Sequence, residues 1–190
     1  MDSLSGVHGY GHDSRRSEVR QRRGLLINAL DILKYGQQTV LKTLAEFPEG
    51  DAERPGACGL WSVKDIIAHL ASYEEVLVDV LSTFLGKHPT PFLNKFTAPG
   101  GQFNDIEVGR RKGRTLREVL GEFNDAHAQT ISLAAQMRPE QFRHSGTLPW
   151  YAMEYSLDDF IVYTFYGHKR EHSAQIDAFR DLLIREATVL

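Results

Sequence analysis

The chain has 190 residues, of which 42% are hydrophobic, and this length and composition suit one soluble domain with one sizeable core. Its formal net charge of -3 and its pI near 6.2 argue against nucleic-acid binding, which needs a clustered surplus of Lys and Arg. The sequence lacks an apolar run of the roughly 18 residues that span a membrane, and its single cysteine, Cys58, excludes an intramolecular disulfide. We therefore expect a cytoplasmic protein without nucleic-acid or membrane partners.

The N-terminal part of the chain changes character near residue 17. Residues 1–17 are rich in Gly, Ser, His and charge and lack an apolar period, so they predict a flexible tail. Residues 18–190 are expected to form one domain. A helical period of apolar residues from about Ser17 to Phe47 predicts the first helix, and Pro48 ends it.

The second predicted helix begins with a capping box. Ser62 and Asp65 have the S-x-x-D spacing in which each side chain binds the main-chain N–H of the other. An apolar stripe follows and continues to Phe84, after which Gly86 ends the helix.

The segment Lys87–Arg114 contains several Gly and Pro residues and is longer than an ordinary connection. Two interpretations remain open for it. It can be a mobile cover whose Phe92, Phe96 and Phe103 line a cavity and shape a substrate entrance, or an ordered crossover whose phenylalanines complete the core.

Two further capping boxes precede the last two predicted helices. Thr115 with Glu118 begins the third helix, which carries apolar residues until Arg138-Pro139, and Ser156 with Asp159 begins a last helix that runs nearly to the C-terminus. We find no sustained period-two alternation that would predict strands. Four amphipathic helices and one long crossover predict an all-α four-helix bundle.

Four of the eight histidines lie on or beside the apolar stripes of these helices. His168 and His172 are four residues apart, so on a helix their Cβ atoms are about 5–6 Å apart and both imidazoles can bind one ion. His69 lies on the inward side of the second helix. Several buried imidazoles each need a hydrogen-bond partner, whereas one metal ion satisfies them together.

Two motifs resemble the DinB superfamily. They are Trp61-Ser-Val-Lys-Asp-Ile-Ile-Ala-His69-Leu, followed by Tyr73-Glu74, and Tyr166-Gly-His168-Lys-Arg-Glu-His172-Ser-Ala-Gln-Ile. The resemblance covers roughly residues 20 to 185 in element order. It implies a four-helix bundle in which His69, His168 and His172 bind a divalent metal. Zinc and nickel both suit imidazole ligands, and the sequence does not choose between them.

The resemblance also implies kinship with metal- and thiol-dependent transferases and isomerases that use small thiol cofactors. Three neutral imidazoles would leave the ion an open position, where it could lower the pKa of a bound water or thiol near a small electrophilic substrate. The alternative is a non-catalytic bundle in which the metal is structural or the cavity sequesters a small molecule. The expected partners are a small-molecule substrate and a second copy of the chain in a homodimer.

Four other residues carry alternative interpretations. His127 is in register with the inward face of the third helix, as a packed core histidine or, less favoured, as a ligand or a neighbour of one. Asp65 caps its helix, although its spacing would also let it orient His69. Glu74 and Glu171 are expected to be solvated carboxylates, with proton transfer as the alternative.

Overall fold

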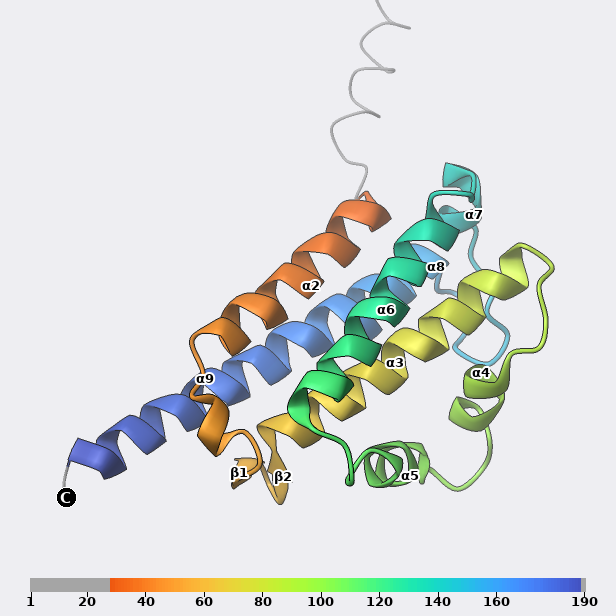
Figure 1. Cartoon of the computed structure of the whole chain (residues 1–190). Coiled ribbons are helices and arrows are strands. Elements are labelled where there is room, and N and C mark those ends of the chain that lie inside the picture. The colour runs from red at the N-terminus through yellow and green to blue at the C-terminus, as the bar shows by residue number, and fades with distance from the viewer. Residues whose placement is uncertain (1–27, 189–190) are drawn as a thin grey trace, which may run out of the picture.

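The computed structural model describes residues 28–188, in which four long helices form a bundle (Figure 1). They are α2 (Ala29–Ala45), α3 (Val63–Phe84), α6 (Leu116–Ala134) and α9 (His168–Thr188). Helices α2 and α9 lie side by side and run in one direction, while α3 and α6 lie side by side and run in the other. The predicted all-α four-helix bundle is confirmed, and none of its helices over these residues has the length and apolarity needed to cross a membrane. The predicted tail over residues 1–17 and the start of the first predicted helix lie outside the described residues.

Three helices begin at the capping boxes predicted from the sequence. In each box a hydroxyl oxygen accepts a hydrogen bond from the main-chain N–H three residues later, and a carboxylate there accepts one from the first residue's N–H. The three pairs are Ser62 with Asp65, Thr115 with Glu118, and Ser156 with Asp159. These local signals fix where α3, α6 and α8 (Leu157–Phe160) start, and thereby which residues face inward.

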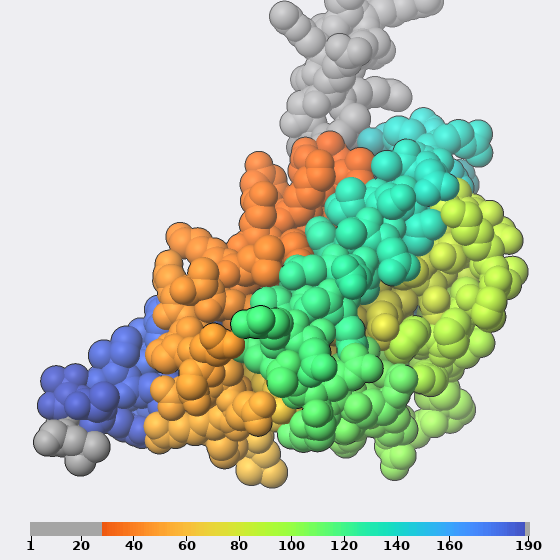
Figure 2. Space-filling model, in the orientation of Figure 1, coloured from red at the N-terminus to blue at the C-terminus, as the bar shows by residue number. Residues whose placement is uncertain are grey.

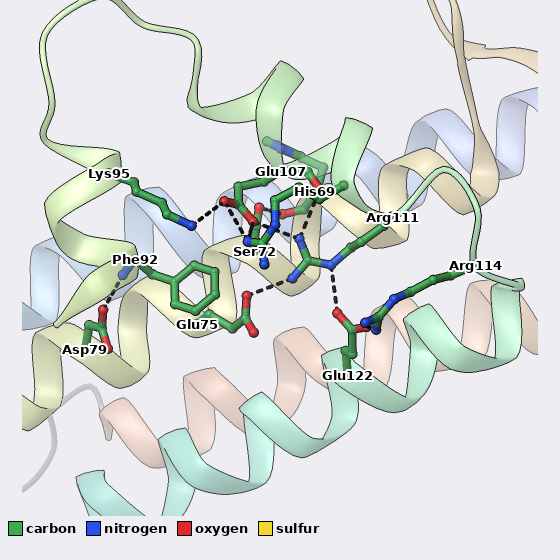
Figure 3. A network of polar contacts seen from close by, with 11 residues as sticks. His69, Ser72, Glu75, Asp79, Phe92, Lys95, Glu107, Arg111, Arg114 and Glu122 are labelled. Atoms are coloured by element: carbon green, nitrogen blue, oxygen red, sulfur yellow. Dashed lines mark hydrogen bonds and ion pairs between the residues drawn. The ribbon is translucent and has the colours of Figure 1, made fainter. Parts of the chain in front are cut away.

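The segment between α3 and α6 is an ordered crossover. Because α3 and α6 run in the same direction, the chain must return along the bundle, and it does so through the short helices α4 (Pro91–Phe96) and α5 (Phe103–Arg110). Arg111, which follows α5, is buried and donates hydrogen bonds to the carboxylates of Glu75, Glu107 and Glu122 (Figure 3). Glu75 belongs to α3 and Glu122 to α6, so one guanidinium ties the crossover to both helices.

A short hairpin between α2 and α3 was not predicted. After the 3-10 turn η1 (Glu49–Asp51), strand β1 (Pro55–Cys58) pairs antiparallel with β2 (Trp61–Ser62). Gly59 has a φ of 59° in the connecting turn, a conformation that favours glycine. Strands of four and two residues are too short to produce a visible alternation of apolar and polar residues, which is why sequence periodicity missed them.

The last predicted helix is interrupted. The helix α7 (Pro139–Arg143) and a loop lead to α8, and α8 continues into a π-helix, η2 (Ile161–Gly167), before α9 begins at His168. A π-helix places an additional residue in each turn, so it shifts the side chains on either side of it and is often found at functional sites. Here it immediately precedes one of the predicted metal ligands.

The core has two apolar clusters separated by a polar layer. On α3 the buried apolar residues between Val63 and Ala71 belong to one cluster, and those between Val76 and Leu81 belong to the other. The buried polar side chains between them come from all four long helices: Gln37, His69, Ser72, Glu74, His127, Thr130, Lys169, His172 and Ser173. In the space-filling view α6 and the crossover cover most of α3 on this face of the molecule (Figure 2).

Candidate metal centre

The structure brings the three predicted histidines together between α3 and α9. Nε2 of His168 lies 2.8 Å from Nε2 of His69 and 2.9 Å from Nε2 of His172. One ring nitrogen from each residue lies within 4.8 Å of the other two. His69 comes from the second turn of α3, whereas His168 and His172 occupy successive turns of α9. Helix pairing therefore joins residues that are 99 positions apart in the chain.

Their surroundings keep the three imidazoles neutral. Burial, followed by the charge that His168 and His172 would carry, lowers the pKa of His69 to about 3. Burial, followed by the charge of His172 and of Lys169, lowers the pKa of His168 to about 4. The pKa of His172 is also lowered by burial. Near neutral pH each ring therefore has an unprotonated nitrogen that can bind a metal ion.

Gln175 fixes which nitrogen of His172 carries the proton. Nδ1 of His172 lies 2.8 Å from Oε1 of Gln175, and because an amide oxygen only accepts, Nδ1 must donate. In the neutral ring Nε2 then presents a lone pair toward His168. A hydrogen bond from a second group that orients the ring in this way is typical of histidines that bind metal. Nothing in the sequence motifs singled out Gln175, although it lies one helical turn after His172.

The π-helix orients His168. A hydrogen bond with the main chain of Thr164, inside η2, raises the pKa of His168 and partly opposes the effect of burial. An acceptor that raises the pKa of an imidazole must be the carbonyl oxygen. This contact uses one side of the His168 ring, and Nε2 on the other side faces His69 and His172. The donor set therefore fits a divalent ion: three neutral rings converge, and two are held by second hydrogen bonds.

Aromatic rings enclose the histidines. The Trp61 ring centroid lies 5.0 Å from that of His69, and the Tyr73 centroid lies 4.7 Å from His69 and 4.6 Å from His168. Phe96 and Phe103 of the crossover pack edge-on against Tyr73, at centroid distances of 5.6 and 5.9 Å. The crossover thus supports the site through Tyr73. Phe103 is buried in the core and Phe96 is partly buried against it, whereas Phe92 lines a separate pocket.

A pocket opens beside the triad. It has a volume of ≈ 470 Å³ and is bounded by one residue of α3, three of η2 and two of α9. These residues are Tyr73, Tyr163, Thr164, Gly167, His168 and Glu171. Because His168 is part of its wall, a small molecule in the pocket would contact the triad. Tyr73 is a further pocket residue that the apolar stripes alone did not single out as functional.

The expectation that Glu74 is solvated is wrong. Its side chain is 0% exposed and forms a buried ion pair with Lys169 of α9, whose side chain is 3% exposed. Oε2 of Glu74 also lies 3.3 Å from Nδ1 of His127 on α6. Burial alone would raise the pKa of Glu74, but Lys169 and His127 outweigh it and lower that pKa. Helices α6 and α9 both pack against α3, so a position outside its apolar stripe still faces another helix.

The structure also places the other three residues for which the sequence left alternatives. His127 is a packed core histidine paired with Glu74, and it lies outside the group of three histidines that could share one ion. Asp65 caps α3 and forms an ion pair with Lys112, while Nδ1 of His69 is buried without a hydrogen-bond partner among the described residues. Glu171 is exposed, as expected for a solvated carboxylate.

The lowered pKa values predict a pH dependence for the metal-free protein. An unfolded histidine has a pKa near 6.5, so above this pH the rings are neutral in both the folded and the unfolded chain. Below pH 6.5 the unfolded chain binds protons that the folded chain does not. The free energy of unfolding therefore falls as the pH decreases toward about 4 and 3, the pKa values of His168 and His69. We expect the denaturation midpoint to fall between pH 6.5 and 5, before most carboxylates titrate. The variant His69→Leu should show a flatter dependence, and an equal slope in both proteins would contradict the prediction.

Comparison with known proteins agrees with this geometry. A sequence profile described as the DinB superfamily matches residues 32–176, which contain all three histidines and most of the bundle. The comparisons find no matching protein among curated sequences and no matching solved structure. Because the profile covers more than half of the chain, with the expected helical fold and histidine cluster, the chain belongs to the DinB superfamily.

Proposed function

We propose that the protein is a metal-dependent enzyme in which His69, His168 and His172 bind zinc or nickel. The metal would activate a small thiol or a water molecule against a small electrophilic substrate, in a transferase or hydrolase reaction. The observation that carries this proposal is the convergence of three neutral imidazoles, with their Nε2 atoms 2.8 and 2.9 Å apart in the two closest pairs. Imidazole nitrogen suits both metals.

The ligand set supports a catalytic site more than a structural one. Structural zinc sites usually have four protein ligands, often cysteines, whereas three histidines leave a position for a substrate or water. A divalent ion in this position supplies Lewis acidity, which lowers the pKa of its fourth ligand and polarises an electrophile. The ≈ 470 Å³ pocket beside His168 gives such a ligand room, and its exposed Gly167 leaves one wall without a side chain.

The protein's own residues would hold this site in place. Gln175 and the carbonyl of Thr164 orient two of the ligand rings. Trp61 of β2 and Tyr73 of α3 pack against the ring of His69 and would limit the access of water to it. The alternative function is a non-catalytic bundle that is stabilised by a metal or sequesters a small molecule.

Metal analysis followed by an activity screen tests the proposal. We expect roughly one equivalent of zinc or nickel per chain after purification without chelators, and loss of activity when the metal is removed. The screen pairs low-molecular-weight thiols, or water alone, with small electrophiles such as epoxides and alkyl halides. A metal-loaded protein without turnover in any pair would favour the non-catalytic alternative, and a protein that binds no metal would exclude the proposed chemistry.

A further inference from the structure

The charged side chain that lines the pocket beside the triad is acidic. Glu171 is the single carboxylate among the six residues that line it, and the other polar groups are hydroxyls and the ring of His168. None of these described lining residues is a lysine or an arginine. A ligand in the pocket would therefore meet one negative side chain beside the metal-binding histidines.

The neighbouring basic residues point to other partners. Lys169 is buried against Glu74, with its Nζ 5.6 Å from the ring centroid of Phe123. Arg170 lies over the ring of Tyr166, at 5.7 Å from its centroid. Within the part of the chain that the structure describes, neither side chain lines the pocket, so neither neutralises Glu171 there.

The spacing between Glu171 and the triad suits a small ligand. Glu171 is three residues after His168 on α9, so their Cβ atoms are about 5–6 Å apart on the same face of the helix. A molecule with two or three bonds between its two functional groups can therefore reach both residues. One group would face the triad, and the other would face the carboxylate.

We infer that the pocket selects a small molecule that carries a positively charged amino group, which Glu171 binds while the other end of the molecule faces the histidine triad. This inference rests on the proposed function, because it takes the triad to be where the ligand reacts. The inference goes beyond the proposed function by specifying that the substrate carries a positive charge. Molecules with a carboxylate at the same position meet Glu171 as a like charge and bind less tightly.

Three small thiols of similar length test the inference: cysteamine, 2-mercaptoethanol and mercaptoacetate carry an ammonium, a hydroxyl and a carboxylate. They are titrated anaerobically into the full chain loaded with Co²⁺, and the cobalt–thiolate absorption band reports binding. We expect cysteamine to bind about fivefold more tightly than 2-mercaptoethanol, with mercaptoacetate weakest. In Glu171→Gln the charge preference should disappear, whereas Glu140→Gln, which changes an exposed carboxylate outside the pocket, should preserve it.

A second variant tests the position of the ligand. A Cβ added at Gly167 meets only the carbonyl oxygen of Val162, at 3.5 Å, so Gly167→Leu should fold and fill the pocket. We expect it to keep cobalt and to bind all three thiols weakly. Undiminished binding of the thiols in Gly167→Leu would place the ligand elsewhere and overturn the inference.

The outcomes separate this inference from the proposed function. If cobalt binds and the order of the three thiols is the same in Glu171→Gln as in the unchanged protein, the role of Glu171 is wrong and the metal site stands. If cobalt does not bind at the histidines, the proposed function fails. In that event NMR titration of the metal-free chain with the same three compounds measures the charge preference. Equal binding of all three compounds would overturn the inference that Glu171 selects an ammonium group.

Discussion

Replacing Glu74 by alanine is expected to lower the free energy of unfolding by about 3–5 kcal/mol. The substitution leaves Lys169 as a buried charge with a side chain 3% exposed and no carboxylate beside it. It also removes the carboxylate next to Nδ1 of His127. Urea denaturation of the metal-free protein measures the effect without a contribution from metal binding. A loss below about 1 kcal/mol would show that the buried pair does not have this energetic role.

Two further variants isolate the buried charge. Glu46 forms an exposed ion pair with Arg180, so Glu46→Ala should change the free energy of unfolding by no more than about 1 kcal/mol. In the double variant Glu74→Leu with Lys169→Met, both members of the buried pair are replaced by apolar side chains. We expect this variant to be more stable than Glu74→Ala, because removal of both charges leaves neither one unpaired.

The histidine triad was predictable because helical periodicity places side chains on faces. The four-residue spacing of His168 and His172 puts both on one face of α9, and the apolar stripe of α3 shows that His69 faces inward. The capping boxes fixed the starts of α3 and α6 from local hydrogen bonding alone. What this reasoning could not supply was the pairing of α3 with α9, which came from the family resemblance.

Glu74 was misjudged because burial depends on every neighbour of a helix. The sequence shows one apolar stripe on α3, and Glu74 is offset from the face of His69. In the fold, α6 packs against α3, and Lys169 of α9 reaches Glu74 from another side. Glu74 is therefore buried although it lies outside the apolar stripe. It remains ionised because Lys169 and His127 pair with its carboxylate and lower its pKa. Such a three-helix contact leaves no periodic signal in the chain.

The π-helix was also beyond the sequence pattern. Apolar residues such as Phe160, Ile161 and Phe165 predict an inward-facing helical stretch, but they do not reveal how many residues each turn contains. Thr164 lies in this π-helix, and its main chain forms a hydrogen bond with His168. Gln175 was missed for a related reason, because its role depends on the rotamer of His172. The sequence thus identified the three candidate ligands, whereas the structure was needed to identify the groups that contact their rings.

Replacing His168 or His172 by alanine is expected to lower the affinity for zinc or nickel at least about 100-fold. Loss of a group that only orients a ligand typically costs about 10- to 100-fold, so loss of a ligand itself should cost at least the upper value. Competition with a chromophoric chelator at neutral pH measures this affinity for each purified variant. His69→Ala should behave in the same way, because its Nε2 lies 2.8 Å from that of His168.

Matched variants distinguish the triad from adventitious binding. His144 is exposed and outside the triad, and His8 and His12 belong to the N-terminal segment outside the described residues, so alanine at any of them should leave the affinity unchanged. Gln175→Leu keeps all three histidines but removes the acceptor that orients His172. Its metal affinity should therefore fall about 10-fold, which is less than in the triad variants and more than in the control variants. Equal affinity in all of these variants would exclude the triad as the metal site, because the ligands contribute in this order only if the ion lies between His69, His168 and His172.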